Sequence, residues 1–154
     1  MFKHILLIYV SLIVTLTLSA QDAQTFTDAE TGVSYTVELV TFANYPIALA
    51  FTPDGRLFYT EKTTGNVRMI AADGVLQTEP VITLPTSAVT ERGMLGIAID
   101  PNYDENGYIW VAHISEPTAR DLPENRLVRF HEENGVGSDP EVMFAVPMEN
   151  NALI

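Results

Sequence analysis

The sequence predicts an all-β fold of the β-propeller type. From residue 33 onwards, short apolar runs alternate with turns that contain Gly, Asn or Asp. No stretch there repeats apolar residues at the spacing of a helix. Short strands with a turn about every 8–12 residues are typical of β-sandwiches and β-propellers.

An internal repeat separates these two architectures. Leu49–Glu61 (LAFTPDGRLFYTE) and Ile97–His113 (IAIDPNYDENGYIWVAH) share the same order of an apolar strand, a Pro- and Gly-containing turn and an aromatic strand. Their prolines, Pro53 and Pro101, are 48 positions apart. A period of about 40–50 residues is typical of propellers, in which each repeat forms one four-stranded blade.

Each strand is predicted from an apolar run between two turns. The expected strands are Tyr35–Val40, Ile47–Phe51, Leu57–Glu61, Val67–Ile70, Val81–Leu84, Met94–Ile99, Tyr108–His113, Leu127–His131 and Val142–Val146. The turns carry Asp-Gly, Asn-Gly or Thr-Gly-Asn, at positions 54–55, 64–66, 73–74, 106–107 and 134–135. Such turns suit tight connections because Gly, and to a lesser degree Asn and Asp, tolerates a positive φ.

The first twenty residues are predicted to be a secretory signal peptide rather than part of the fold. Lys3 precedes an apolar run over Ile5–Leu18, and Ala20 offers a small residue for cleavage. The alternative is a membrane anchor, but this run is shorter than the roughly 20 residues of a spanning helix. We therefore expect a secreted or periplasmic protein, with a polar lead-in at 21–32 and a propeller over 33–154.

Charge and composition exclude several classes of function. The formal net charge is −12, and a surface this acidic repels phosphate backbones, which disfavours nucleic-acid binding. The chain has no Cys, so disulfides, thiolate metal sites and a lipid-modified cysteine anchor are excluded. After cleavage of the signal peptide, no membrane association is expected.

The length is too short for a closed ring. Residues 33–154 correspond to two to three blades, whereas propellers typically close with about four to eight. The chain ends on an apolar tail, Asn151–Ile154. We therefore expect these residues to be the N-terminal part of a longer, incomplete propeller.

The stretch Asp100–Gly107 places oxygen-bearing side chains at every second position, as calcium loops do. An EF-hand loop needs a glycine at its sixth position and a glutamate at its twelfth. Here those positions hold Glu105 and Val111. The sequence therefore favours a loop between two strands whose Asx side chains bond to nearby backbone, and no metal ligand is predicted.

Two histidines each end a predicted strand. His113 follows Tyr108 and Trp110, which are expected in an inter-blade core, and His131 ends the run RLVRFH. Either could act as a general base, but neither has a second histidine or an aligned carboxylate nearby. The sequence favours structural or surface roles for both, and common hydrolase motifs are absent.

The segment Glu91–Gly93 is the one candidate for function. Two opposite charges and a glycine precede a buried strand, and in propellers such strand starts can lie at the mouth of the ring, where ligands bind. A plain salt-bridged loop explains the same residues equally well. Both interpretations stay open at this point.

Three motifs in this order resemble a known family. They are Pro46–Ile70, Glu91–His113 and Asn125–Phe130, and together they are similar to the start of the soluble quinoprotein glucose/sorbosone dehydrogenases, which include the aldose sugar dehydrogenases. The resemblance implies a six-bladed propeller, exported from the cell, that holds pyrroloquinoline quinone (PQQ) and often needs calcium. A histidine would remove the proton of the sugar's anomeric hydroxyl while the quinone accepts hydride.

Few of the family's functional residues fall within this chain. Glu91 occupies the place of a Gln that contacts quinone and sugar, so Glu91 is the predicted cofactor-binding residue. A carboxylate there would repel the anionic quinone unless it is protonated or paired with Arg92 or calcium. The catalytic base and the calcium ligands are expected beyond Ile154, since His113 and His131 match none of the family's residues.

The favoured function is PQQ-dependent oxidation of an aldose sugar at its anomeric carbon by the full-length protein, with no activity in this portion alone. The alternative is a non-catalytic extracellular binding propeller similar to the animal hedgehog-interacting proteins. A third possibility is a lactonase-type propeller with calcium in its channel. The sugar, the electron acceptor and the oligomeric state stay open.

Overall fold

The computed structural model describes residues 23–118 and 121–148, and the chain divides between Leu39 and Val40 into two compact units. The first contains an antiparallel hairpin of β1 (Gln24–Thr27) and β2 (Ser34–Val37). The sequence did not predict β1, which lies inside the polar lead-in, and β2 ends three residues earlier than predicted. The predicted signal peptide at 1–20 lies outside the described residues and stays a prediction.

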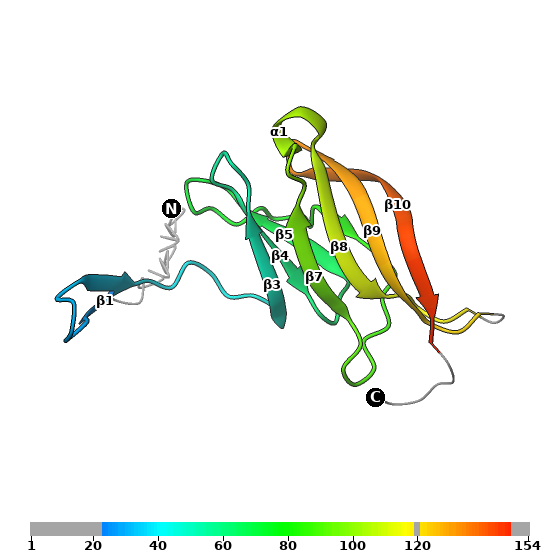
Figure 1. Cartoon of the computed structure of the whole chain (residues 1–154), viewed down its shortest axis with the longest axis horizontal. Coiled ribbons are helices and arrows are strands. Elements are labelled where there is room, and N and C mark those ends of the chain that lie inside the picture. The colour runs from blue at the N-terminus through cyan, green and yellow to red at the C-terminus, as the bar shows by residue number, and fades with distance from the viewer. Residues whose placement is uncertain (1–22, 119–120, 149–154) are drawn as a thin grey trace, which may run out of the picture. The chain divides into compact units, whose positions relative to one another are not determined.

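The second unit consists of two four-stranded antiparallel sheets (Figure 1). The first sheet contains β3 (Pro46–Phe51), β4 (Leu57–Glu61), β5 (Asn66–Ile70) and β6 (Ile82–Thr83), in that order. The second contains β7 (Met94–Ile99), β8 (Tyr108–Ile114), β9 (Glu124–Glu133) and β10 (Val136–Pro147). Each sheet is a simple meander, as in a propeller blade. The predicted partial propeller is confirmed, with two blades.

The hairpin of β9 and β10 shows why the turns could be predicted. Asn134 and Gly135 connect the two strands with φ values of 53° and 82°, the combination of a type I′ turn. Pairing then runs from Val136 opposite Glu133 to Pro147 opposite Glu124, with two irregularities. Both strands are therefore longer than their apolar runs alone suggested.

The connection between β7 and β8 contains a helical turn that was not predicted, α1 (Tyr103–Asn106). It ends at Gly107, whose φ is 62° and whose N–H donates to the carbonyl oxygen of Tyr103. Asp100 organises the loop, because its Oδ1 accepts from the Asn106 side chain at 3.0 Å and its Oδ2 from the Trp110 indole at 2.8 Å. The backbone N–H of Asn102 also donates to Asp100 Oδ1 at 3.0 Å, and that of Tyr108 donates to Asn106 Oδ1 at 2.9 Å. Asx side chains thus bond to nearby backbone, as the loop interpretation predicts.

The hydrophobic core lies between the two sheets. Its buried members are Phe58, Val67, Met69, Val81, Leu84, Met94, Tyr103, Ile109, Val111, Val128 and Phe130. Side chains alternate along a strand, so β8 directs Ile109 and Val111 into this core and Trp110 to the opposite face. There the Arg129 guanidinium covers Tyr108 at 4.2 Å and Trp110 at 5.6 Å. The expectation that both aromatics belong to the core between the blades is therefore wrong for this pair of blades.

Backbone hydrogen bonds join the two blades at several points. The N–H of Met94 donates to the carbonyl oxygen of Lys62 at 3.1 Å, and that of Gly137 donates to Val81 at 2.8 Å. Within the part of the chain that the structure describes, no helix has the length and apolarity needed to cross a membrane.

Candidate functional site

The chain passes from the first blade to the second between β6 and β7, and this crossing carries the candidate segment Glu91–Gly93. The N–H of Ser87 donates to the carbonyl oxygen of Ile114 at 2.9 Å, which fastens the crossing to the end of β8. The chain then reverses at Thr90, whose φ is 54°. The candidate segment therefore lies at one end of the second blade.

Gly93 allows the crossing to approach the first blade closely. Its φ is 152°, and a Cβ there would lie 2.4 Å from Lys62 Cγ and 2.7 Å from the Lys62 carbonyl oxygen. The Lys62 ammonium also donates to the carbonyl oxygen of Thr90 at 2.7 Å. The glycine of this motif is therefore required by packing, whatever its neighbours bind.

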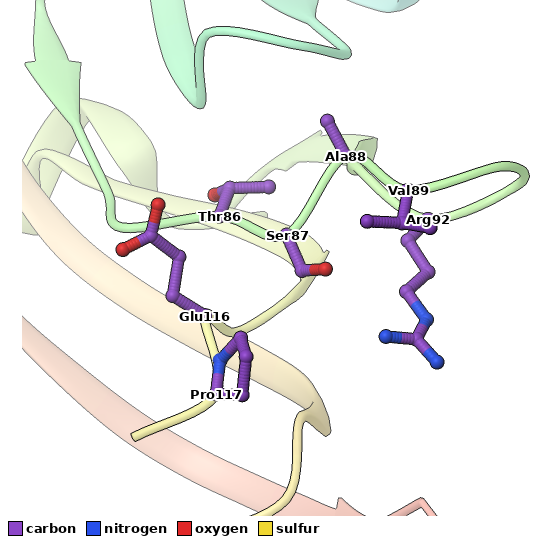
Figure 2. Close-up of a pocket in the computed structure, with 7 residues that line it drawn as sticks. All are labelled: Thr86, Ser87, Ala88, Val89, Arg92, Glu116 and Pro117. Atoms are coloured by element: carbon purple, nitrogen blue, oxygen red, sulfur yellow. The ribbon is translucent and has the colours of Figure 1, made fainter. Parts of the chain in front are cut away.

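A pocket of about 570 Å³ opens beside this crossing (Figure 2). Its walls are formed by Thr86, Ser87, Ala88, Val89, Arg92, Glu116 and Pro117. Arg92 and Glu116 come from opposite sides of the pocket. Arg92 is only 8% exposed, and its guanidinium makes no hydrogen bond or ion pair within residues 23–118 and 121–148. An arginine side chain beside hydroxyl groups, with no ion pair in the described residues, suits an anionic group of a ligand.

Glu91, the predicted cofactor-binding residue, is exposed and does not line this pocket. The structure contains no ion pair between Glu91 and Arg92. The salt-bridged loop is therefore not formed between these two side chains. The cofactor-binding role of Glu91 stays a prediction.

The two histidines lie at opposite ends of the β8–β9 pair. His113 is buried, and its Nδ1 lies 3.0 Å from Thr86 Oγ1, immediately behind the pocket wall. His131 is half-buried and packs edge-on against Tyr108, with ring centroids 6.1 Å apart. Both positions are consistent with the structural roles that the sequence favoured.

Sequence reasoning missed Ser87 and Glu116 as pocket residues, and it included Arg92 only within the candidate segment and as a partner for Glu91. Ser87 and Glu116 are brought together by the isolated bridge between Thr86 and Ser115. Ser87 and Glu116 lie in different loops, and no local sequence pattern identifies either as a pocket residue. The one sequence signal for this site was the pair of charged residues before a glycine in Glu91–Gly93.

Comparison with known proteins supports the fold and identifies the family. Residues 43–152 match the family model described as glucose/sorbosone dehydrogenase. The quinoprotein glucose dehydrogenase B of Acinetobacter calcoaceticus is 29% identical over 96 residues, which cover 59% of this chain and 20% of that protein. The chain therefore spans about a fifth of this curated relative.

Two solved structures share the architecture. An oxidoreductase (glucose dehydrogenase) of Thermus thermophilus matches with a TM-score of 0.60 and 27% identity, over 70% of this chain and 31% of its own. The PQQ-bound aldose sugar dehydrogenase of Streptomyces coelicolor matches with a TM-score of 0.58 and 23% identity, over 69% of this chain and 31% of its own. With both blades inside the matched residues 43–152, the chain belongs to the glucose/sorbosone dehydrogenase family.

Proposed function

We propose that this chain is the N-terminal part of a PQQ-dependent dehydrogenase that oxidises an aldose sugar at its anomeric carbon. The observation that carries the proposal is the family match over residues 43–152, which includes both blades and the crossing between them. A quinoprotein glucose dehydrogenase is among the relatives. Because the chain spans only 20–31% of these proteins, the activity is assigned to the full-length protein.

The pocket beside Arg92 partly fits an anionic cofactor. The Arg92 guanidinium, which has no ion pair in the described part of the chain, and the Ser87 hydroxyl would contribute hydrogen-bond donors to a carboxylate group of PQQ. Glu91 opposes such binding, because its exposed carboxylate has no cationic partner in the described residues. PQQ would supply the hydride acceptor, and the chain's own residues would bind and orient it.

Other parts of the proposal concern residues outside the described ranges. The catalytic histidine and any calcium ligands are placed beyond Ile154, in further blades of a six-bladed ring. Cleavage after Ala20 would deliver the protein to the periplasm or the extracellular space.

The test uses the full-length protein, expressed from the complete reading frame and freed of cofactor. PQQ is titrated in, and reduction of an artificial electron-accepting dye is followed with a panel of aldoses. We expect turnover that requires both PQQ and a sugar with a free anomeric hydroxyl. A folded full-length protein that neither binds PQQ nor oxidises any aldose would refute the proposal and favour the non-catalytic binding propeller.

A further inference from the structure

The crossing between the blades reverses direction over residues 88–92, which we call the crossing turn. Figure 2 shows the chain running outward from Val89 and returning to Arg92, whose side chain lines the pocket. The N–H of Arg92 donates to the carbonyl oxygen of Val89 at 3.1 Å and closes the turn. The place of the Arg92 side chain therefore depends on the place of this turn.

The backbone of the crossing turn is strained at its tip. Thr90 has a φ of 54°, which is unfavourable for a β-branched residue. Its own hydroxyl donates to the carbonyl oxygen of Val89 at 2.8 Å, a bond that lies within the turn. A conformation of this kind persists only where surrounding contacts hold it. The crossing turn therefore needs a contact from another segment.

Lys62, in the connection between β4 and β5, supplies that contact. Its ammonium donates to the carbonyl oxygen of Thr90 at 2.7 Å. In the described part of the chain, this is the one hydrogen bond that joins the crossing turn to another segment. Lys62 forms no ion pair within residues 23–118 and 121–148, so no carboxylate there competes with the Thr90 carbonyl for the ammonium.

The neighbours of Lys62 fix both its backbone and its side chain. Its N–H donates to the carbonyl oxygen of Tyr45, and its own carbonyl oxygen accepts from the N–H of Met94, both at 3.1 Å. The ammonium lies 5.4 Å from the centroid of the Tyr45 ring, within the range of a cation–π contact. The stem passes Gly93, where a Cβ would collide with Lys62 Cγ. These contacts direct the ammonium at Thr90, although a free lysine side chain has many rotamers.

We propose that Lys62 is a positioning residue of the pocket beside Arg92. Its ammonium holds the crossing turn, and the turn in its place holds Arg92 where an anionic group of a ligand can bind. Lys62 does not line the pocket, so it acts through the turn and does not touch the ligand. The role in ligand binding rests on the proposed function, whereas the hold on the turn is independent of it.

The first test needs no ligand. Hydrogen exchange of the cofactor-free full-length protein is followed by mass spectrometry at pH 7. Lys62→Met keeps an unbranched stem beside Gly93 and removes the ammonium. We expect amide exchange over residues 85–93 to become about tenfold faster, the effect of one lost hydrogen bond on local opening, while exchange in β8 and β9 stays unchanged.

Matched variants separate this role from a general effect on stability. Lys62→Arg keeps a charged donor and should restore slow exchange over residues 85–93. Arg129→Met removes the cation of the surface pair with Glu141 and should leave exchange there unchanged. The proposal is overturned by unchanged exchange in Lys62→Met, by faster exchange spread over both blades, or by a failure of Lys62→Arg to restore protection.

The second test is an absorbance titration of the same variants with PQQ. We expect Lys62→Met to bind PQQ about tenfold more weakly, as for one hydrogen bond lost to the ligand, and Lys62→Arg to bind it as the unaltered protein does. The loss should persist at about 1 M salt, where a Debye length of about 3 Å screens a charge that does not touch the ligand.

The two tests fail in different ways. A loosened crossing turn with unchanged PQQ affinity would overturn the positioning role of Lys62, and a loss of affinity that disappears at high salt would reduce Lys62 to a distant charge. If the unaltered full-length protein binds no PQQ, the proposed function fails. Hydrogen exchange then still decides the hold on the turn, which local deprotection in Lys62→Met supports and its absence refutes.

Discussion

Arg56 of the first blade and Glu132 of the second form an ion pair across the interface, with 2.9 Å between Nη1 and Oε1. The Glu132 side chain is 1% exposed. It also accepts from the Tyr103 hydroxyl, and from the N–H of Gly135 at 2.6 Å. Arg56 donates in addition to Asp54 and to Tyr103. One buried carboxylate thus gathers donors from both blades.

The charges of this cluster stabilise each other. Burial lowers the pKa of Arg56, but the hydrogen bond and the negative charge of Glu132 outweigh it, so the guanidinium stays protonated. Burial, together with Glu132, raises the pKa of the Tyr103 hydroxyl well above its ordinary value. Tyr103 therefore remains a neutral donor to Glu132.

Removal of the cation should destabilise the interface. In Arg56→Ala, Glu132 stays buried without its counter-ion, and we expect the free energy of unfolding of the full-length protein to fall by about 3 kcal/mol. Arg56→Lys should recover only part of the lost free energy of unfolding, because an ammonium cannot reach Asp54, Glu132 and Tyr103 at once. Urea denaturation measures both.

The control is Glu141→Gln, which breaks the surface pair between Arg129 and Glu141, whose carboxylate side chain is 60% exposed. Such pairs contribute about 0–1 kcal/mol. Equal losses in Arg56→Ala and Glu141→Gln would contradict a special role for the buried pair.

The close approach of Gly93 to Lys62 gives a second prediction. In Gly93→Ala the new Cβ would collide with the Lys62 side chain and carbonyl, and the unfavourable φ adds strain. We expect a loss of more than about 2 kcal/mol. Gly74→Ala is matched, since its φ is 85° but no atom lies within 4 Å of the new Cβ, and it should lose only about 1 kcal/mol. Thermal denaturation with similar losses in the two variants would argue against the packing explanation.

His113 should make stability depend on pH. Its pKa is about 4 in the folded protein and 6.5 ordinarily, so between these values the unfolded chain binds a proton that the folded chain does not. The free energy of unfolding should therefore decrease as pH falls from about 6.5 to about 4, by up to about 3 kcal/mol, and His113 adds no further decrease below that.

This dependence is isolated by comparison with His113→Gln, which should lack that part of the slope, and with His131→Asn, which should keep it. Asp54 and Asp100 have pKa values lowered by their hydrogen bonds and titrate below this range. Chemical denaturation at several pH values measures the slopes. If the free energy of unfolding depended on pH equally in His113→Gln and in the unaltered protein, protonation of His113 would not destabilise the fold, which would contradict the prediction.

Glu91 gives a prediction on cofactor affinity. If PQQ binds beside Arg92, Glu91→Gln removes a repulsive charge, and we expect PQQ to bind the full-length protein about 3- to 10-fold more tightly at low salt, with a smaller gain at high salt. Glu79→Gln removes an exposed carboxylate that does not line the pocket and should change nothing. Absorbance titration with PQQ measures both. Unchanged or weaker binding in Glu91→Gln would exclude Glu91 from the vicinity of the cofactor.

The strands were predictable because their signals are local. The alternation on β8 and the Asn134-Gly135 turn are each contained in a few consecutive residues, and the eight strands from β3 onwards occur where they were expected. The missed elements, β1 and α1, have four residues each and carry no apolar period. Such short polar segments adopt a regular structure because of contacts with neighbouring segments, and their own sequence has no periodic pattern that predicts it.

The sequence by itself determined the class of fold, the repeat that makes each blade and the position of the crossing that carries Glu91–Gly93. Tertiary structure alone decided that Arg92, and not Glu91, lines the pocket, and that Arg56 meets Glu132 across 76 positions of sequence. The position of Arg92 depends on how the crossing is fastened to β8 and to Lys62, and the Arg56–Glu132 pair depends on how the two blades pack together. Contacts between distant segments set the direction of each side chain, and local sequence does not encode them.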